Sequence, residues 1–380
     1  MLKIVADENI EGLSQYLGHL GSIRTVKGRG LGSSDLHDAD VLLVRSVTAV
    51  NEALLGGTSV KFVGTATSGF DHLDTQYLDQ AGIAFAHAPG SNANSVVEYV
   101  LGAIGAVDQK LEQLFSGGTV GIVGYGNIGR LLAKRLEALK INYRVYDPWL
   151  TNEQISNPAS LNDILRCDVI SVHAELTSKE PWPSHHLFAR QELAKIPQNS
   201  LLINASRGSI VDNVALQSRL NDIDAPVTIL DVWEQEPRVD EGLLAQVRFG
   251  TAHIAGYSRD GKLLATRMLR DALLKSTGIS ARVNEQDVAV PDIHLPPGLS
   301  GAALLRALLA YNYSLSEDDR LLRESVHGLS DGPKATNFDR LRRDYSSRRE
   351  VYGARVVAEL GSPYDRYILM AMGCQLATQA

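Results

Sequence analysis

Short apolar runs rich in β-branched residues recur in the first part of the chain. They are residues 2–6 (LKIVA), 41–44 (VLLV) and 60–69 (VKFVGTATSG), and each run ends in polar residues or glycine. Buried strands of a parallel sheet have this pattern. Amphipathic helical patterns lie between the runs, for example residues 10–20 (IEGLSQYLGHL). The alternation of strand and helix patterns predicts an α/β domain.

A long helical pattern separates this series from a second one. It covers residues 95–115 and predicts a single helix, with Ser95 as the N-cap and Glu98 completing a capping box. The alternating series after it predicts a second α/β domain with a doubly wound parallel sheet. Its candidate strands are residues 119–123, 143–146, 168–172, 200–203 and 227–230.

The last part of the chain changes character twice. Residues 258–277 have a helical pattern, and we expect this helix to return to the first domain. Residues 290–301 are rich in proline and glycine and predict a linker. Beyond the linker, residues 302–380 predict a small α+β segment. No internal repeat is visible.

Composition and charge narrow the classes of function. The net charge is −7 and the pI is about 5.8, which argues against a nucleic-acid-binding protein. The two cysteines, Cys167 and Cys374, make no disulfide framework. The first ten residues include Asp7 and Glu8, so we expect no signal peptide, and the apolar run 96–107 is too short to span a bilayer. We expect a cytoplasmic protein that binds neither membrane nor nucleic acid.

Residues 119–129 (TVGIVGYGNIG) contain the glycine pattern of dinucleotide-binding loops. Gly124, Gly126 and Gly129 follow a predicted strand and lead into a predicted helix. The glycines permit a tight turn, a close approach to a pyrophosphate and close helix packing, while Asn127 and Ile128 lie at the helix N-terminus that faces the phosphates. Asp147 ends the next strand, 18 residues after Gly129. A carboxylate there accepts ribose hydroxyls and repels a 2′-phosphate, so we expect NAD rather than NADP.

Three chemically capable side chains follow successive strands of the same domain. Arg207 lies in INASRGSIVDN, Glu236 in DVWEQEP and His253 in TAHIAGYS. Because ligands of open α/β sheets bind at the carboxyl ends of the strands, we expect the three to share one edge. An imidazole held by a carboxylate can accept a hydroxyl proton, and a guanidinium can bind a carboxylate substrate. The three side chains suit the oxidation of a 2-hydroxy acid, and we expect no metal ion in the site.

The ordered motifs GYGNIG, Asp147–Pro148, NASRG, DVWEQEP and HIAGYS resemble those of the D-isomer-specific 2-hydroxyacid dehydrogenases. The resemblance implies that Arg207, Glu236 and His253 are catalytic. It also implies that Ala205, Ser206, Arg207 and Asp231 contact NAD. In this family the NAD-binding domain is inserted into a discontinuous substrate-binding domain. The implied boundaries are 1–95 with 256–285 for the substrate-binding domain, 96–255 for the NAD-binding domain and 286–380 for a C-terminal domain that dimerises.

A closer resemblance to one branch of this family involves residues 44–55, 61–74, 88–100 and 336–350. It implies a phosphorylated 2-hydroxy acid as substrate and a homodimer. The implied substrate contacts are Ser46 and Thr67, with Tyr257, Arg45, Ser68 and Gly69 as further candidates. Arginines of the C-terminal segment are a second source of cations for the phosphate, either within the chain or across a dimer, and a solvated helix face is the alternative explanation for them. They are Arg342, Arg343, Arg348 and Arg349.

Two features leave alternatives open. Residues 174–186 (AELTSKEPWPSHH) depart from the usual family pattern, which puts the contacts on the nicotinamide side in doubt. A different dehydrogenase of the family, acting on 3-phosphoglycerate or an unphosphorylated hydroxy acid, stays possible. A second alternative is an NAD(H)-sensing corepressor that binds peptides. A third is a C-terminal dimer module that follows an enzyme losing its activity, but none of the candidate catalytic positions is disrupted.

Overall fold

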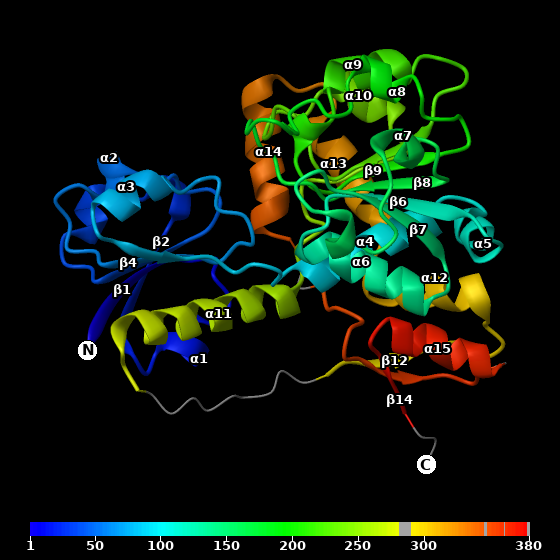
Figure 1. Ribbon diagram of the computed structural model, residues 1–380. Coiled ribbons are helices and arrows are strands. Elements are labelled where there is room, and N and C mark those ends of the chain that lie inside the picture. Colours follow the sequence, from blue (N-terminus) through cyan, green and yellow to red (C-terminus); the bar gives the residue numbers. More distant parts are fainter. Residues whose placement is uncertain (281–289, 346–347, 361, 378–380) are drawn as a thin grey trace. The chain divides into compact units, whose positions relative to one another are not determined.

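The computed structural model describes residues 1–280, 290–345, 348–360 and 362–377. Its internal contacts divide the chain into two compact units. Unit 1 comprises residues 1–92 with the segment that starts at Ser258, and unit 2 comprises Ala93–Tyr257 with the segment that starts at Val290 (Figure 1). The chain therefore enters and leaves unit 1 more than once, as a discontinuous domain does.

Unit 1 contains a five-stranded parallel sheet in the order β2-β1-β3-β4-β5. Alternate residues of its strands face opposite sides: Ile4 and Leu43 pack with Leu269 of helix α11, and Val63 belongs to a separate core on the other side. Helices on both faces make the sheet doubly wound. The strands are β1 (Leu2–Asp7), β2 (Gly21–Val26), β3 (Val41–Val44), β4 (Phe62–Thr65) and β5 (Ala84–Ala86), and the α-helices are α1 (Leu13–Leu17), α2 (Glu52–Leu55), α3 (Thr75–Gln80) and α11 (Arg259–Thr277).

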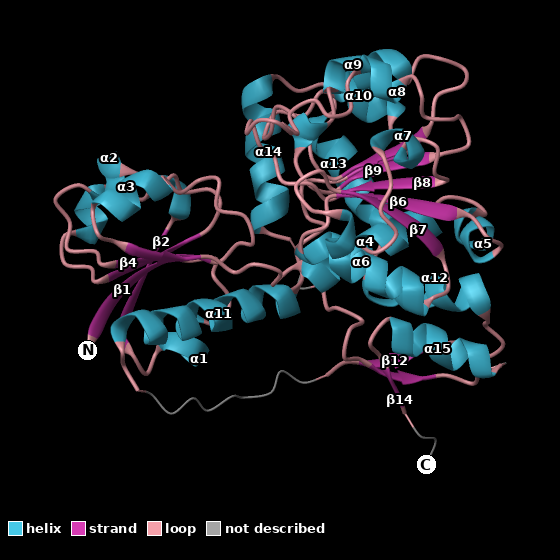
Figure 2. Cartoon of the chain, viewed as in Figure 1, coloured by secondary structure: helices cyan, strands magenta, loops and turns pink. Residues whose placement is uncertain are grey.

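Unit 2 is built on a six-stranded parallel sheet in the order β11-β10-β9-β8-β6-β7. Helices lie on both of its faces (Figure 2). The strands are β6 (Thr119–Val123), β7 (Asn142–Tyr146), β8 (Val169–Val172), β9 (Leu201–Asn204), β10 (Val227–Leu230) and β11 (Phe249–Gly250). The α-helices before the C-terminal segment are α4 (Ala93–Gly105), α5 (Lys110–Phe115), α6 (Asn127–Ala138), α7 (Leu161–Ile164), α8 (Arg190–Leu193), α9 (Asn213–Arg219) and α10 (Glu241–Gln246). Single 3-10 turns lie at Gly28–Gly30 and Ser33–Leu36 in unit 1, and at Asn152–Gln154 and Gly208–Ile210 in unit 2.

The C-terminal segment adds a third, three-stranded parallel sheet in the order β12-β13-β14. Its leucines Leu304, Leu305 and Leu308 join the main core of unit 2. Helix α12 packs against α4, and α13 packs against β11. The elements are β12 (Asp292–His294), β13 (Arg355–Val357), β14 (Gln375–Leu376), α12 (Gly301–Asn312), α13 (Leu315–Val326), α14 (Asp331–Arg343) and α15 (Pro363–Ala371).

The fold class predicted from the sequence is confirmed: two doubly wound parallel sheets and a small C-terminal segment of helices and strands, whose own small sheet is parallel. Every predicted strand region contains a strand. The helix predicted for residues 258–277 forms as α11, and the Ser258 Oγ caps it by accepting from the Gly261 N–H at 2.9 Å. The predicted linker 290–301 contains strand β12, which pairs with β13.

The single helix predicted for residues 95–115 is wrong. The structure has two helices, because α4 ends at Gly105 and Gln109 adopts a left-handed φ of 59° before α5. The Arg306 Nε of α12 donates to the Gly105 carbonyl at 3.0 Å, which satisfies a carbonyl at the helix end. Ser95 is not the N-cap either; it lies inside α4 and its Oγ donates to the Ala255 carbonyl at 2.9 Å.

Glu98 of α4 links this helix to the C-terminal segment. Its carboxylate oxygens accept from the backbone N–H groups of Val351 and Tyr352 at 3.0 Å. Burial and the nearby Glu350 carboxylate together raise the pKa of the Glu98 carboxyl to about 8. The folded chain therefore holds this proton above the pH at which an unfolded glutamate loses it. The stability that this proton contributes is lost as the pH rises through about 8.

We expect Glu98→Gln to flatten the stability profile between the two pKa values of this carboxyl, about 4.5 unfolded and about 8 folded. The free energy of unfolding of the unaltered chain should fall between about pH 5 and pH 8, and the variant should lose less over that range because its amide does not titrate. Urea unfolding at several pH values measures this. Glu112→Gln is the control, since the pKa of the exposed Glu112 is lowered by its hydrogen bond to Arg306. Parallel profiles for Glu98→Gln and the unaltered chain would contradict the assignment.

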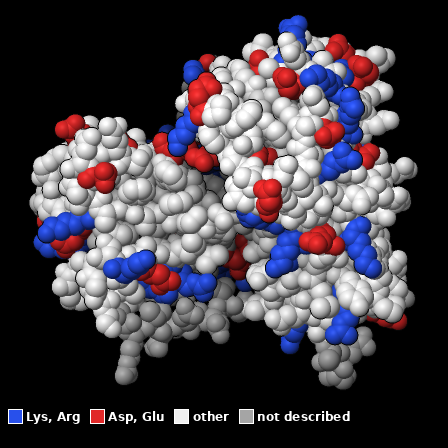
Figure 3. Space-filling view, viewed as in Figure 1, with Lys and Arg blue, Asp and Glu red and all other residues white. Residues whose placement is uncertain are grey.

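Two observations concern the surface and the membrane. None of the helices in the described parts of the chain is long and apolar enough to cross a membrane. On the face drawn in Figure 3, Lys and Arg side chains are interspersed with Asp and Glu, without a broad basic area. An anionic ligand on an acidic chain such as this one therefore needs cations placed locally.

Candidate active site

A cavity of about 680 Å³ lies at the carboxyl ends of β6, β7 and β8 in unit 2. The order β8-β6-β7 places the change in winding direction of the sheet between β6 and β8, and ligands of doubly wound sheets bind at such a point. The lining includes the glycine loop after β6, the turn after β7 and the residues after β8. These residues are Val123–Asn127, Arg130, Tyr146–Leu150, His173–Glu175, Thr177, Lys179, Pro181–Ser184 and Leu187.

The glycine loop has the geometry that a dinucleotide needs. A Cβ on Gly129 would lie 2.0 Å from the carbonyl oxygen of Gly124, so the first turn of α6 can pack against the loop only with glycine there. A Cβ on Gly126 would meet no atom within 4 Å, which leaves open space beside the backbone. Asn127 and Ile128 form the N-terminal turn of α6, whose free N–H groups suit a pyrophosphate. The loop therefore fits NAD.

Asp147 connects the loop to the end of β7. Its Oδ2 accepts from the Tyr125 N–H at 2.8 Å, and its Oδ1 accepts from the Trp149 N–H at 3.0 Å. The carboxylate lines the cavity, where its remaining acceptor capacity faces the ligand space. The position matches the predicted contact to the ribose hydroxyls.

The unusual segment 174–186 forms one wall of the same cavity. Ser184 holds the segment closed, since its Oγ donates to the Glu175 carbonyl at 2.6 Å and accepts from the Thr177 N–H at 2.8 Å. Lys179 and Trp182 are among its lining residues. The segment that departs from the family pattern therefore lies in the wall of this cavity.

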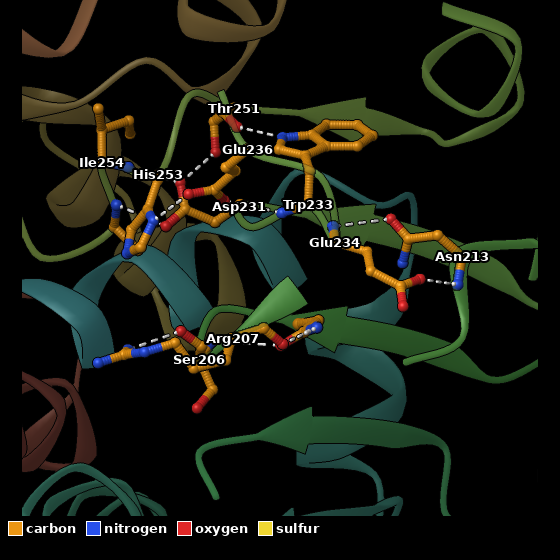
Figure 4. A network of polar contacts seen from close by, with 12 residues as sticks. Ser206, Arg207, Asn213, Asp231, Trp233, Glu234, Glu236, Thr251, His253 and Ile254 are labelled. Carbon is orange, nitrogen blue, oxygen red and sulfur yellow. Dashed lines mark hydrogen bonds and ion pairs between the residues drawn. The ribbon is translucent and has the colours of Figure 1, made fainter. Parts of the chain in front are cut away.

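Arg207, Glu236 and His253 lie on loops that follow three adjacent strands, β9, β10 and β11. Because these strands are parallel, their carboxyl ends meet at one edge of the sheet. Figure 4 shows Glu236 and His253 facing each other, with the Arg207 side chain coming from the neighbouring loop. The edge expected from the sequence therefore carries all three side chains.

Glu236 and His253 form a hydrogen-bonded pair. The His253 Nδ1 lies 2.8 Å from the Glu236 Oε2, and the other carboxylate oxygen accepts from the Trp233 N–H at 2.8 Å. Burial would raise the pKa of the Glu236 carboxyl, but His253, Arg342 and the Trp233 N–H outweigh burial and lower it. The carboxylate thus stays charged and fixes Nδ1 of the imidazole. This leaves Nε2 for a substrate proton.

Asp231 organises the loop that carries His253. Its buried carboxylate accepts from the Thr251 hydroxyl at 2.6 Å, the Ile254 N–H at 2.7 Å and the Ala255 N–H at 3.0 Å (Figure 4). The Asp231 carbonyl accepts from the His253 N–H at 2.7 Å. His253 itself has a left-handed φ of 55°, a conformation that these surrounding bonds maintain. Asp231 was predicted as an NAD contact; the structure adds a positioning role.

The glycine after Arg207 has a packing reason. A Cβ on Gly208 would lie 2.1 Å from the backbone carbonyl of Trp233, so the Arg207 loop and the Glu236 loop can touch only with glycine there. Arg207 is partly exposed, and its Nη1 donates to the Ser206 carbonyl at 3.0 Å. The preceding Ala205 is buried, while the Ser206 Oγ donates to the Ala174 carbonyl. This arrangement joins the catalytic loops to the nucleotide cavity.

The predicted substrate residues of unit 1 lie on the loops after two adjacent strands. Arg45 and Ser46 follow β3, and Thr67–Gly69 follow β4. The Thr67 Oγ1 lies 2.6 Å from the Thr65 Oγ1 and donates to the Gly69 carbonyl at 2.8 Å. The Ser68 Oγ accepts from the Gly90 N–H at 3.1 Å. The structure thus gathers these candidates at one edge of their own sheet.

The arginines of the C-terminal segment have different surroundings. Arg348 is only 6% exposed and donates to the carbonyls of Ser95 at 3.0 Å and Ala255 at 2.7 Å. These contacts bind Arg348 to its own unit, so the solvated helix face considered for it is wrong, while a contact across a dimer stays a prediction. Arg343 is exposed and pairs with Asp344 at 2.8 Å, as expected for a solvated helix face.

One group of side chains has a spacing that could hold a metal ion. Ligand atoms of His185, His186 and Glu234 lie within 4.8 Å of one another. The His186 Nε2 lies 2.5 Å from the Glu234 Oε1, and the other oxygen of Glu234 accepts from the Asn213 N–H at 3.1 Å. These hydrogen bonds account for the grouping without a metal.

Sequence reasoning missed His173 as part of the site. It follows β8 and lines the nucleotide cavity, and its Nε2 lies 2.8 Å from the Ser171 Oγ. Burial lowers the pKa of His173 to about 3, so the imidazole is neutral. The only available signal was its place at the end of a strand.

Comparison with known proteins places the chain in a family. Residues 102–255 match the model of the D-isomer specific 2-hydroxyacid dehydrogenase NAD binding domain, and residues 287–373 match a domain of unknown function. Erythronate-4-phosphate dehydrogenase of Cellvibrio japonicus is 43% identical over 378 residues, covering 98% of this chain and 99% of the relative. The protein of the same name from Marinobacter nauticus is 41% identical over 382 residues, covering 98% and 99%. The chain belongs to the erythronate-4-phosphate dehydrogenase family.

Solved structures agree with this assignment at the level of the fold. The NAD-bound 3-phosphoglycerate dehydrogenase of Entamoeba histolytica aligns with a TM-score of 0.62 and 22% identity, over 76% of this chain and 99% of that one. D-Lactate dehydrogenase of Aquifex aeolicus, complexed with NAD and lactic acid, gives 0.59 and 22%, over 73% and 96%. The predicted cofactor, NAD, is confirmed by the match of residues 102–255 to the NAD binding domain of the D-isomer specific 2-hydroxyacid dehydrogenases.

Proposed function

We propose that this protein oxidises 4-phospho-D-erythronate to (R)-3-hydroxy-2-oxo-4-phosphooxybutanoate with NAD, as a step in the biosynthesis of pyridoxal 5′-phosphate. The relatives named for this substrate match the chain over nearly its full length. The observation in the structure that carries the proposal is the hydrogen bond of 2.8 Å between Glu236 and His253. It joins the loops after β10 and β11, and the loop with Arg207 follows the adjacent strand β9. Those three groups supply what oxidation of a 2-hydroxy acid requires of a protein.

Each of the three side chains has a distinct task in this reaction. The Arg207 guanidinium binds the substrate carboxylate and orients C2. His253 accepts the proton of the C2 hydroxyl at Nε2, while Glu236 stabilises the imidazolium that forms. NAD held by the glycine loop and Asp147 would supply the acceptor for the hydride of C2, so that the alcohol could become a ketone with NADH as the second product.

Turnover with a panel of substrates tests the proposal. NADH formation from NAD should be much faster with 4-phospho-D-erythronate than with 3-phospho-D-glycerate or D-lactate. Faster turnover of 3-phosphoglycerate would assign a different dehydrogenase activity. Absence of turnover with every hydroxy acid, together with intact NADH binding, would favour a nucleotide-sensing protein.

Asp147 should set the preference for NAD over NADP. Asp147→Asn removes the charge that repels a 2′-phosphate and one of two backbone hydrogen bonds, so we expect KM for NAD to rise about 10- to 100-fold. The preference for NAD over NADP in kcat/KM should fall at least about tenfold. Steady-state kinetics with both nucleotides measure this, and Glu153→Gln at an exposed position is the control. An unchanged preference would remove Asp147 from nucleotide selection.

We further propose a cytoplasmic homodimer that associates through the C-terminal segment. The two cysteines are unpaired and buried, which suits a reducing compartment. Tyr352, Tyr367 and Met370 of the C-terminal segment are large apolar side chains that are more than half exposed at 53%, 57% and 57%. Sedimentation velocity of the unaltered chain tests the dimer.

A further inference from the structure

Arg342 connects the C-terminal segment with the loop that carries His253. It lies next to the last residue of α14, and its guanidinium carbon is 5.6 Å from the ring centroid of Tyr257. Tyr257 is four residues after His253 and its N–H donates to the Ile254 carbonyl at 2.8 Å, so it belongs to the same turn. A residue distant in the sequence is thereby placed beside the catalytic loop.

The positive charge of Arg342 interacts with the Glu236 carboxylate of the Glu236–His253 pair. Burial would lower the pKa of Arg342, but Tyr257 and the carboxylates of Glu236 and Asp231 outweigh burial and raise it. Arg342 in turn contributes to lowering the pKa of Glu236. The guanidinium is therefore charged and lies within electrostatic range of the carboxylate that holds His253.

Arg342 also has hydrogen-bonding capacity left over. Its Nε is buried and finds no acceptor among the described residues. The next residue, Arg343, is exposed and paired with Asp344, and Arg323 of the preceding helix is paired with Asp319 at 2.9 Å. A buried N–H without an acceptor is unfavourable, and an anionic ligand satisfies it. The Arg342 side chain as a whole is partly exposed, which leaves it accessible to a ligand.

We propose that Arg342 binds the phosphate group of the substrate. The inference rests on the proposed function, in which Arg207 takes the carboxylate and His253 faces the C2 hydroxyl. The phosphate on C4 is two carbons from the reacting C2, so its cation has to lie within a side chain's length of His253. Arg342, against Tyr257, occupies such a place, and its planar guanidinium donates to phosphate oxygens in pairs. Arg342 is then a substrate-binding residue that determines specificity for phosphorylated substrates.

The test compares two substrates and two neighbouring arginines. We expect Arg342→Gln to lower kcat/KM for 4-phospho-D-erythronate about 10- to 100-fold and to leave kcat/KM for unphosphorylated D-erythronate within about twofold. Arg342→Lys should recover part of the loss, because lysine restores the positive charge but cannot donate two parallel hydrogen bonds. Arg343→Gln, one residue further along, should change neither value.

Binding of inorganic phosphate gives a second readout that needs no turnover. Calorimetric titration into the NADH-loaded full chain should show binding that Arg342→Gln weakens at least about tenfold and Arg343→Gln does not. Equal losses on both substrates would show that Arg342 acts only through Glu236 and His253, and would overturn the proposal. Unchanged kinetics and phosphate binding would also overturn it and direct attention to Arg45. Failure of the unaltered protein to oxidise 4-phospho-D-erythronate would instead overturn the proposed function, while phosphate binding would still report on Arg342.

Discussion

His253→Asn should lower kcat for 4-phospho-D-erythronate by about 10²- to 10⁴-fold, the range that a positioned general base usually contributes. Asparagine offers no basic nitrogen, so the hydroxyl proton loses its acceptor. The Glu236 carboxylate, 2.8 Å from the imidazole in the unaltered chain, would be left without the group that it orients. NAD binding should persist, because the glycine loop and Asp147 follow β6 and β7 at the other end of the sheet order.

Two measurements separate these effects. Steady-state turnover gives kcat, and fluorescence titration with NADH gives the affinity for the nucleotide. His327→Asn is the matched control, since His327 is an exposed histidine that pairs with Glu241 at 2.9 Å on the surface of the same unit. A His253→Asn enzyme with unchanged kcat would remove His253 from the mechanism. A parallel loss of NADH affinity would show that the substitution disturbs the unit more widely.

Arg207→Lys should lower kcat/KM for the same substrate about 100-fold. A lysine keeps the charge but cannot donate two parallel hydrogen bonds to a carboxylate. Losing one of the two charge-assisted hydrogen bonds costs up to about 3 kcal/mol, and each 1.36 kcal/mol is a factor of ten. The backbone should tolerate the exchange, because the close approach to Trp233 is made by Gly208.

The Arg207 prediction is checked by steady-state kinetics against a control in the same unit. Arg248→Lys replaces an exposed arginine that stacks over Phe249 at 5.1 Å, and it should leave kcat/KM within about twofold. If Arg207→Lys behaved like Arg248→Lys, the carboxylate of the substrate would have to bind elsewhere.

Local patterns were sufficient to predict the sheets. A buried parallel strand needs a short apolar run, and VLLV at residues 41–44 forms β3 without a change of boundary. The glycine loop was equally readable, because the close approach of Gly129 to Gly124 excludes every larger residue. Edge strands were harder: β5 (Ala84–Ala86) is largely exposed, and its three residues are too few to form a recognisable pattern.

Features set by distant contacts could not be predicted from local patterns. The break between α4 and α5 is stabilised by Arg306, roughly 200 positions away in the chain, whose Nε bonds the Gly105 carbonyl. Arg348 was predicted either to supply a cation to the phosphate or to lie on a solvated helix face, and the structure buries it against Ser95 and Ala255. Periodicity identifies a helix face, but it does not identify the partner of that face.

The candidate site shows the same division. The strand-end rule placed Arg207, Glu236 and His253 at one edge, and the sheet order agrees. The positioning role of Asp231 was missed because the Ile254 and Ala255 N–H groups that it accepts become neighbours only in the folded loop. Arg342 was one of several arginines in a charged run, and only packing against Tyr257 distinguishes it.

The most direct test of the central claim is a crystal structure of the full chain with NADH and 4-phospho-D-erythronate bound. The account predicts the C2 hydroxyl within hydrogen-bond distance of the His253 Nε2, with the Arg207 guanidinium on the carboxylate and the Glu236 carboxylate still on Nδ1. A substrate whose hydroxyl points away from His253, or whose carboxylate lies away from Arg207, would contradict it.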